Sequence, residues 1–194
     1  MILKYSKEVL ELVHQKKWVD AAYRLMWEWH ANRNDLDAIL RYGCALWWLL
    51  TYDYTYVELS KDRAIDQFIR LGFEGHLSTV AELGFLNHKE APRFQAIFGW
   101  LISIHPFYFF SIGIGDTCDE VESVGMQMIK SAYEANPNDP FYKSMYTVGI
   151  ADYEAHRSAR NQMASKQEYY FEDDDFVGTY FLSQFSAVFD SESD

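Results

Sequence analysis

Apolar residues recur at the spacing of an α-helix along most of this chain, and this periodicity limits the possible fold more than any other feature. The clearest stripe consists of Val121, Val124, Gly125, Met128, Ile129, Ala132 and Tyr133. Similar stripes run through residues 18–29 and 36–47, and the Asn and Asp residues between them suit helix caps. No stretch shows the sustained alternation of apolar and polar residues that a half-buried strand requires. The sequence therefore predicts an all-α fold.

The same periodicity divides the chain into eight or nine helices joined by short loops. A short helix is expected to end near Gly72, and another to begin at Leu77. Further helices are expected over 94–104, 121–133, 141–165 and 175–189. Because short connections favour antiparallel neighbours, we expect a single domain, residues 1–194, built from antiparallel helical hairpins. The hairpins can form either an open stack or a compact bundle.

Residues 96–115 carry no formal charge and have to be considered as a membrane span. Pro106 stands in the middle of this stretch and would break a helix, so we expect a buried helix, a turn at His105–Pro106 and a second buried piece. The N-terminal residues lack the apolar run of a signal peptide. Cys44 and Cys118 offer no disulfide framework and no metal-ligand spacing. These features predict a cytoplasmic protein that does not enter the membrane.

Residues 125–139 contain small and large apolar side chains followed by a proline. Gly125, Ile129, Ala132 and Pro137 are spaced by four, three and five residues. This pattern resembles the second helix and exit turn of a tetratricopeptide repeat, in which small residues allow close helix approach. The resemblance covers about 35 residues, roughly the length of one repeat. It implies degenerate tetratricopeptide-like hairpins, because no strict period runs along the chain.

The sequence contains no P-loop, no dinucleotide-binding glycine fingerprint, no nucleophile elbow and no zinc-protease motif. Two acid–histidine pairs at helical spacing are candidates for a metal site, Glu11 with His14 and Asp152 with His156. A di-iron bundle needs a second such pair opposite Glu11 and His14, and the sequence offers none. The second pair can also act as an acid–base pair. We expect no metal, no cofactor and no enzymatic activity, with a metal-dependent enzyme acting through Asp152 and His156 as a minor alternative.

The formal net charge of the chain is -12, and it is unevenly distributed. Residues 1–70 contain ten basic and ten acidic residues, whereas residues 167–194 contain eight acidic residues and neither Lys nor Arg. A nucleic-acid backbone must be met by clustered Lys and Arg, so we expect no nucleic-acid binding. An acidic surface instead suits a basic protein partner and speeds its association.

The acidic C-terminal stretch interleaves carboxylates with aromatic rings. Its candidate partner-binding residues are Glu168, Tyr169, Tyr170, Glu172, Asp173, Asp174 and Asp175. In one interpretation the three Asp residues cap a final helix whose Phe residues pack on the core. In the other, the tyrosines supply contact area and the carboxylates steer a partner into place.

A second acidic cluster precedes the helix expected over 121–133. It consists of Asp116, Asp119, Glu120 and Glu122, and the last three are further candidates for partner binding. The same two interpretations apply, because carboxylates at a helix start also serve as N-terminal caps.

By size, acidity and aromatic content, the chain resembles the immunity proteins of bacterial toxin systems, including contact-dependent inhibition. That resemblance implies binding to a cognate toxin, often a basic nuclease, and occlusion of its active surface. It rests on composition, so no family residue can be assigned. The alternative is a tetratricopeptide-like adaptor that holds a peptide or a larger assembly. The oligomeric state is left open.

Overall fold

The computed structural model describes residues 3–51 and 63–164. These residues form eight α-helices and one 3-10 helix and contain no strand, which confirms the predicted all-α fold. In chain order the elements are α1 (Lys7–His14), α2 (Trp18–Ala31), α3 (Leu36–Thr51), α4 (Arg63–His88), α5 (Pro92–Ile104), η1 (Pro106–Ile112), α6 (Cys118–Ala135), α7 (Pro140–Gly149) and α8 (Tyr153–Ala164). The helix expected over 175–189 lies outside the described residues.

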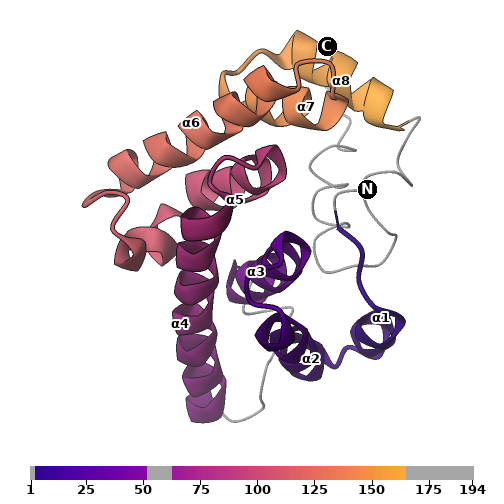
Figure 1. Ribbon diagram of the computed structural model, residues 1–194, viewed down its shortest axis with the longest axis vertical. Coiled ribbons are helices and arrows are strands. Elements are labelled where there is room, and N and C mark those ends of the chain that lie inside the picture. The colour runs from indigo at the N-terminus through magenta and orange to yellow at the C-terminus, as the bar shows by residue number, and fades with distance from the viewer. Residues whose placement is uncertain (1–2, 52–62, 165–194) are drawn as a thin grey trace, which may run out of the picture.

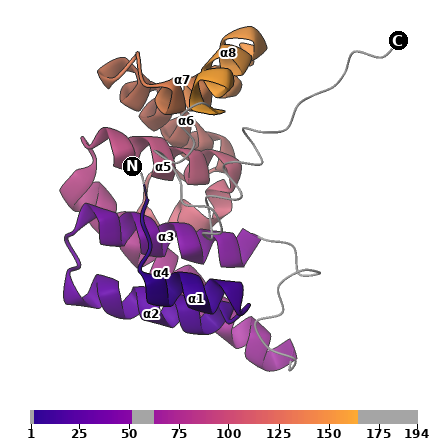
Figure 2. The same cartoon turned by 90° about the vertical axis from the view of Figure 1, so that its right-hand side faces the viewer.

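Helices that follow one another in the sequence pack against each other. α1 contacts α2, α2 contacts α3, and α3 contacts α4, while α5 to α8 form a second series of the same kind. Figure 1 shows the long α4 running along one side of α2 and α3 and reaching α5 at its upper end. In Figure 2 the second series lies above the first.

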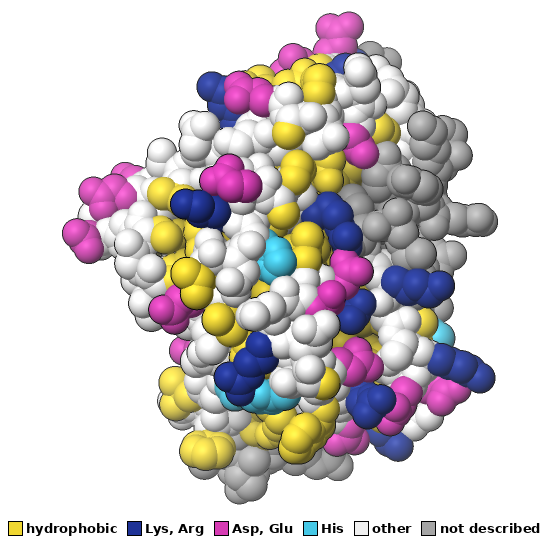
Figure 3. Space-filling model, in the orientation of Figure 1, with side chains coloured by type: hydrophobic (Ala, Val, Ile, Leu, Met, Phe, Trp, Pro, Cys, Tyr) yellow, Lys and Arg dark blue, Asp and Glu magenta, His cyan; other side chains and the backbone are white. Residues whose placement is uncertain are grey.

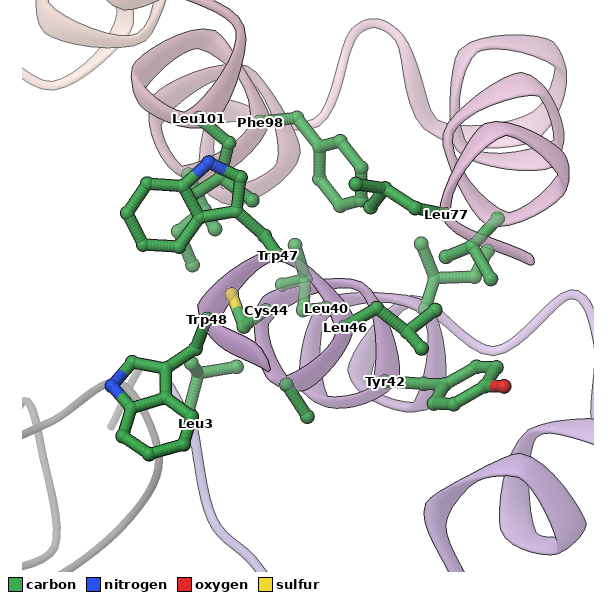
Figure 4. Close-up of a cluster of buried hydrophobic side chains, with 14 of the residues drawn as sticks. Leu3, Leu40, Tyr42, Cys44, Leu46, Trp47, Trp48, Leu77, Phe98 and Leu101 are labelled. Atoms are coloured by element: carbon green, nitrogen blue, oxygen red, sulfur yellow. The ribbon is translucent and has the colours of Figure 1, made fainter. Parts of the chain in front are cut away.

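Helix α3 is the centre of the core, because α2, α4 and α5 pack against it and bury most of its residues. Its buried residues are Ala38, Ile39, Leu40 and all of 42–50. Figure 4 shows Trp47 beside Leu101 of α5 and Trp48 beside Leu3, which lies in the extended N-terminal segment. Burial therefore extends well beyond the single stripe that the sequence predicts for this helix.

The C-terminal end of α3 is enclosed by other elements, and side chains supply donors for its last carbonyl groups. Nη1 of Arg70 in α4 donates to the Leu49 carbonyl at 2.8 Å, and the Tyr108 hydroxyl of η1 donates to the Leu50 carbonyl at 2.9 Å. Arg70 also pairs with Asp66, with 2.8 Å between Nε and Oδ2. Because buried helix ends need such partners, these side chains fix the end of α3 to α4 and η1.

Helices α5 and α6 approach each other closely where two glycines meet. A Cβ atom added to Gly125 would lie 2.6 Å from the Gly99 carbonyl oxygen, and one added to Gly99 would lie 2.8 Å from the Gly125 carbonyl oxygen. Ile129 and Ala132 follow on the same buried face of α6. The close approach predicted from Gly125 and Ala132 is thus present, and Gly99 is its counterpart on α5.

The sequence prediction divided α4 wrongly. It placed one helix end near Gly72 and a new helix at Leu77, whereas α4 continues without a break from Arg63 to His88. Gly72 and Gly75 are exposed and have no neighbouring atoms where a Cβ would stand. Glycine inside a helix costs only about 1 kcal/mol, which burial of residues such as Phe73 and Leu77 on the inner face outweighs.

The single helix expected over 141–165 is in fact two helices. α7 ends at Gly149 and α8 begins at Tyr153, and Ala151 between them has a left-handed backbone with φ of 58°. The Asp152 carboxylate accepts a hydrogen bond from the Ala155 amide at 3.1 Å and so caps α8. The turn lets α8 fold back on α7.

The chain turns at His105–Pro106 as expected, and η1 is bent by 115° from α5. The piece after the turn is less buried than predicted, because Phe109 is fully enclosed but Phe107 and Phe110 are exposed. Among the described residues no single helix is long and apolar enough to cross a membrane, and only the bent pair of α5 and η1 reaches that length and composition.

Candidate functional site

Helix α6 begins with a capped and strongly acidic turn. The N-cap residue is Thr117, whose Oγ1 accepts a hydrogen bond from the Glu120 amide at 3.3 Å. The Glu120 carboxylate reaches back, and its Oε2 accepts from the Asp116 amide at 2.8 Å. This is the reciprocal arrangement of a capping box, and negative charge is favourable at the positive end of the helix dipole. Capping therefore accounts for Glu120.

The other three carboxylates of this cluster point into solvent. Asp116, Asp119 and Glu122 are all exposed, and within the described part of the chain none of them forms an ion pair. Figure 3 shows acidic side chains gathered at the left edge of the molecule, where α6 begins. The hydrogen bonds of the cap hold these groups at one end of a helix without using their carboxylates. We call Asp116, Asp119 and Glu122 the α6 acidic face.

The α6 acidic face is not arranged as a chelate. In residues 3–51 and 63–164, no three His, Cys, Asp or Glu side chains are placed so that they can hold a metal ion. Separated carboxylates act on a partner through their electric field rather than by coordination. The candidate residues at 168–175 lie outside the described residues, so their part in binding stays a prediction.

Charge is divided unevenly between the described residues and the rest of the sequence. The described residues contain fifteen basic and eighteen acidic side chains, so they are close to neutral. Most of the excess negative charge lies in residues 165–194. Within the described part, the start of α6 is the densest acidic run in the sequence.

Asp152 and His156 do not form the acid–base or metal-binding pair considered from their spacing. Asp152 caps α8, while His156 is buried between α7 and α8. Nδ1 of His156 lies 3.0 Å from the Ser144 carbonyl oxygen and 3.1 Å from the Ser144 hydroxyl. The pKa of His156 is lowered overall. Burial is the largest cause and Arg160 adds to it, while the hydrogen bond to the Ser144 carbonyl acts in the opposite direction.

Ser144 and His156 resemble a nucleophile and its base in distance only. An Nδ1–H that donates to the Ser144 carbonyl cannot take the proton of the Ser144 hydroxyl. Ser144 is also completely buried, so a substrate cannot reach its hydroxyl. The pair instead joins α7 to α8.

Sequence analysis missed a cluster of aromatic and basic side chains where α2, α3 and α4 meet. The Trp29 ring lies 5.5 Å from the Tyr42 ring and 6.5 Å from the His76 ring, centroid to centroid. The His30 ring is 4.9 Å from that of Trp29, and Cζ of Arg33 is 5.1 Å from its centroid. In the lower half of the face shown in Figure 3, histidine lies beside basic and hydrophobic side chains. Helical spacing cannot reveal this cluster, since its members come from three separate helices.

No protein-family model matches the chain, and neither a curated protein nor a solved structure matches it. The resemblances to tetratricopeptide repeats and to immunity proteins therefore stay predictions.

Proposed function

We propose that this chain is a non-catalytic, cytoplasmic protein-binding module that neutralises a basic partner, such as a nuclease toxin domain, by covering its active surface. The observation that carries the proposal is the α6 acidic face. Its three carboxylates stand exposed at one end of a helix, while the cap is completed by Thr117 and Glu120 alone. Carboxylates that take part in neither the cap hydrogen bonds nor an ion pair among the described residues are available to a partner.

Electrostatic attraction suits this role for a physical reason. A site built to bind phosphates is positively charged, so an acidic face can occupy it, and opposite charges raise the rate of association. The C-terminal stretch at 168–175 would add to the same field, since residues 167–194 contain no basic side chain. Rapid capture favours inhibition of a toxin before it acts.

Exposed aromatic residues favour protein binding in general. Trp27 is 65% exposed and Tyr23, one turn earlier on α2, is 45% exposed. Trp and Tyr are enriched among the residues that dominate binding energy at protein interfaces. Because Tyr23 and Trp27 lie one turn apart on α2, this helix offers a second contact region.

A tetratricopeptide-like adaptor is the second candidate, and the packing of α6 favours it. Gly125 meets the α5 backbone, and Ala132 is buried on the same helix face, as in a repeat of that type. Tyr133 of α6 stacks on Tyr146 of α7 with 4.8 Å between ring centroids and 10° between planes. An adaptor would bind its ligand through such ordered aromatic side chains.

The test is a binding titration with the partner that co-purifies from the native organism or is encoded beside this chain. The double variant Asp119→Asn, Glu122→Gln removes two exposed charges and leaves the cap intact. We expect it to weaken binding about threefold to tenfold at low salt and to flatten the salt dependence. Asp173, Asp174 and Asp175 changed together to Asn form a separate arm with the same expected direction.

The matched control is the double variant Asp20→Asn, Glu154→Gln. Both residues are exposed, and they lie on α2 and α8. This pair changes the net charge by the same amount at other places, so it should reduce affinity much less. Equal losses in the two double variants would show that net charge alone acts. Unchanged affinity in every acidic variant would refute a basic partner, and a partner with an acidic surface would favour the adaptor.

A further inference from the structure

The interior of the α2–α3–α4 junction contains a hydrogen bond between a tyrosine and a histidine. The Tyr42 hydroxyl of α3 lies 2.8 Å from Nδ1 of His76 on α4. Tyr42 is 1% exposed, and burial, with a further contribution from Tyr23, raises its pKa well above the ordinary range. Tyr42 therefore keeps its proton and can donate it to Nδ1 of a neutral His76. A proton on Nδ1 would turn that atom into a donor, and the buried Tyr42 proton would then have to turn away from it.

A second contact of the same cluster holds Arg33, which brings a positive charge to it. Nη2 of Arg33 is 2.6 Å from Nδ1 of His30, and Nε of Arg33 is 3.2 Å from the same atom. The guanidinium can only donate, so Nδ1 of His30 accepts. The contact keeps the Arg33 cation beside the Trp29 ring.

Trp29 connects the two contacts and holds α2 to its neighbours by ring packing. Its ring lies beside those of His30, Tyr42 and His76 and beside the Arg33 guanidinium. The indole Nε1 is buried and has no hydrogen-bond partner among the described residues. The end of α2 is thus held here by aromatic contacts that include the ring of His76.

We propose that Trp29, His30, Arg33, Tyr42 and His76 form an acid-sensitive latch, which holds the C-terminal end of α2 against α3 and α4 at neutral pH and loosens when His76 takes up a proton. We call these five residues the α2 latch. The groups that act on the charge of His76 are His30 and Arg33, from α2 and the turn after it, while α3 contributes the uncharged Tyr42. A protonated His76 would place a second cation beside the Trp29 ring, which Arg33 already contacts.

The direction of the effect follows from the protonation equilibrium. Burial lowers the pKa of His76 from its ordinary value of 6.5, and His30 and Arg33 lower it further. The unfolded or opened chain then binds more protons than the closed one as the pH falls below 6.5. The stability of the closed latch is complete above that pH and decreases below it, until the closed form is itself protonated.

Hydrogen exchange of the whole protein tests the latch, with the intrinsic exchange rate at each pH divided out. Between about pH 7.5 and pH 5.5, we expect protection of the α2 amides to fall up to about tenfold more than protection of the α6 amides, since protonation of an opened His76 with the ordinary pKa of 6.5 favours the opened form by that factor over this range. His76→Asn should abolish this extra loss. Its Oδ1 can accept from Tyr42 but does not titrate.

His156→Asn is the matched control, because His156 is also a histidine whose pKa burial lowers, but it lies between α7 and α8. The acid sensitivity of α2 should persist in this variant. If α2 loses protection equally in wild type and in His76→Asn, or if it loses none, the latch is refuted. Should His76→Asn fold poorly, NMR titration of the unmodified protein decides. The Trp29 indole signal should shift with the same midpoint as the His76 ring, and a pH-independent Trp29 would overturn the proposal.

Discussion

Replacing Gly125 by Ala sets two known effects of opposite sign against each other. Alanine favours a helix over glycine by about 1 kcal/mol, which alone would stabilise α6. The new Cβ, however, would lie 2.6 Å from the Gly99 carbonyl oxygen and 2.8 Å from the Ser103 amide nitrogen, where ordinary van der Waals contact begins at 3.4 Å. Both atoms belong to the α5 backbone, so the clash cannot be relieved by rotating a side chain.

The helices must therefore separate along one of the largest contacts in the molecule. Overpacking of a core costs about 1–3 kcal/mol where side chains can adjust, and backbone partners place this case at the upper end. Subtracting the gain in helix propensity, we expect Gly125→Ala to reduce the free energy of unfolding by about 2 kcal/mol. For a chain of this length that corresponds to a melting temperature roughly 4–8 °C lower.

Urea denaturation followed by circular dichroism measures the change, and a second glycine provides the control. Gly75 lies in the middle of α4 with no atom near the position of a Cβ. Gly75→Ala should therefore raise the free energy of unfolding by about 0.5–1 kcal/mol. Opposite signs for the two substitutions would support the packing argument. A Gly125→Ala protein as stable as wild type would refute the close approach of α5 and α6.

Two further substitutions test the ends of helices. Arg70→Met leaves the buried Leu49 carbonyl without its 2.8 Å donor and removes one partner of Asp66, so we expect about 3 kcal/mol lower stability in the same denaturation assay. A loss below about 1 kcal/mol would contradict the role of Arg70 at the end of α3. Thr117→Ala removes the side-chain cap of α6 and should lower the free energy of unfolding by about 1 kcal/mol. The loss is measurable as a lower urea midpoint at unchanged slope. A stability equal to that of the wild type would show that the cap is dispensable.

The apolar stripes of α2 and α6 could be predicted from the sequence because each helix buries one face. α3 shows where this reasoning reaches its limit. Its stripe at 36–47 predicts one buried side, but α3 is enclosed by α2, α4, α5 and the N-terminal segment, and nearly all its residues are buried. Periodicity identifies the helix, whereas enclosure depends on which other elements surround it.

Helix boundaries failed where a local preference opposed tertiary packing. Gly72 suggested an end to the helix that burial of the inner face of α4 overrides. Ala151 produced the reverse error, since nothing about an alanine indicates the left-handed backbone that separates α7 from α8. That conformation is held by the contacts of the hairpin and by the Asp152 cap, both of which depend on the folded chain.

Contacts of histidines show the same limit. Helical spacing offered Asp152 with His156 as a minor alternative, and the fold gives these two residues different roles. Tyr42 and His76 are 34 positions apart, so their contact could not be found from spacing. Among the candidate binding residues that the structure describes, Asp119, Glu120 and Glu122 could be predicted because they are neighbours in sequence as well as in space. Local clusters are therefore the part of a site that sequence reasoning can find.

The acidic residues of α6 allow helix stabilisation to be separated from partner binding. Asp119 lies in the first turn, where its charge interacts favourably with the helix dipole, whereas Glu122 lies beyond that turn and the dipole effect has largely decayed. Asp119→Asn should therefore lower stability by about 0.5 kcal/mol, and Glu122→Gln should leave stability almost unchanged. If the α6 acidic face binds a basic partner, both substitutions weaken binding to a similar extent. Loss of binding in Asp119→Asn alone would show that the charge acts on the helix rather than on the partner.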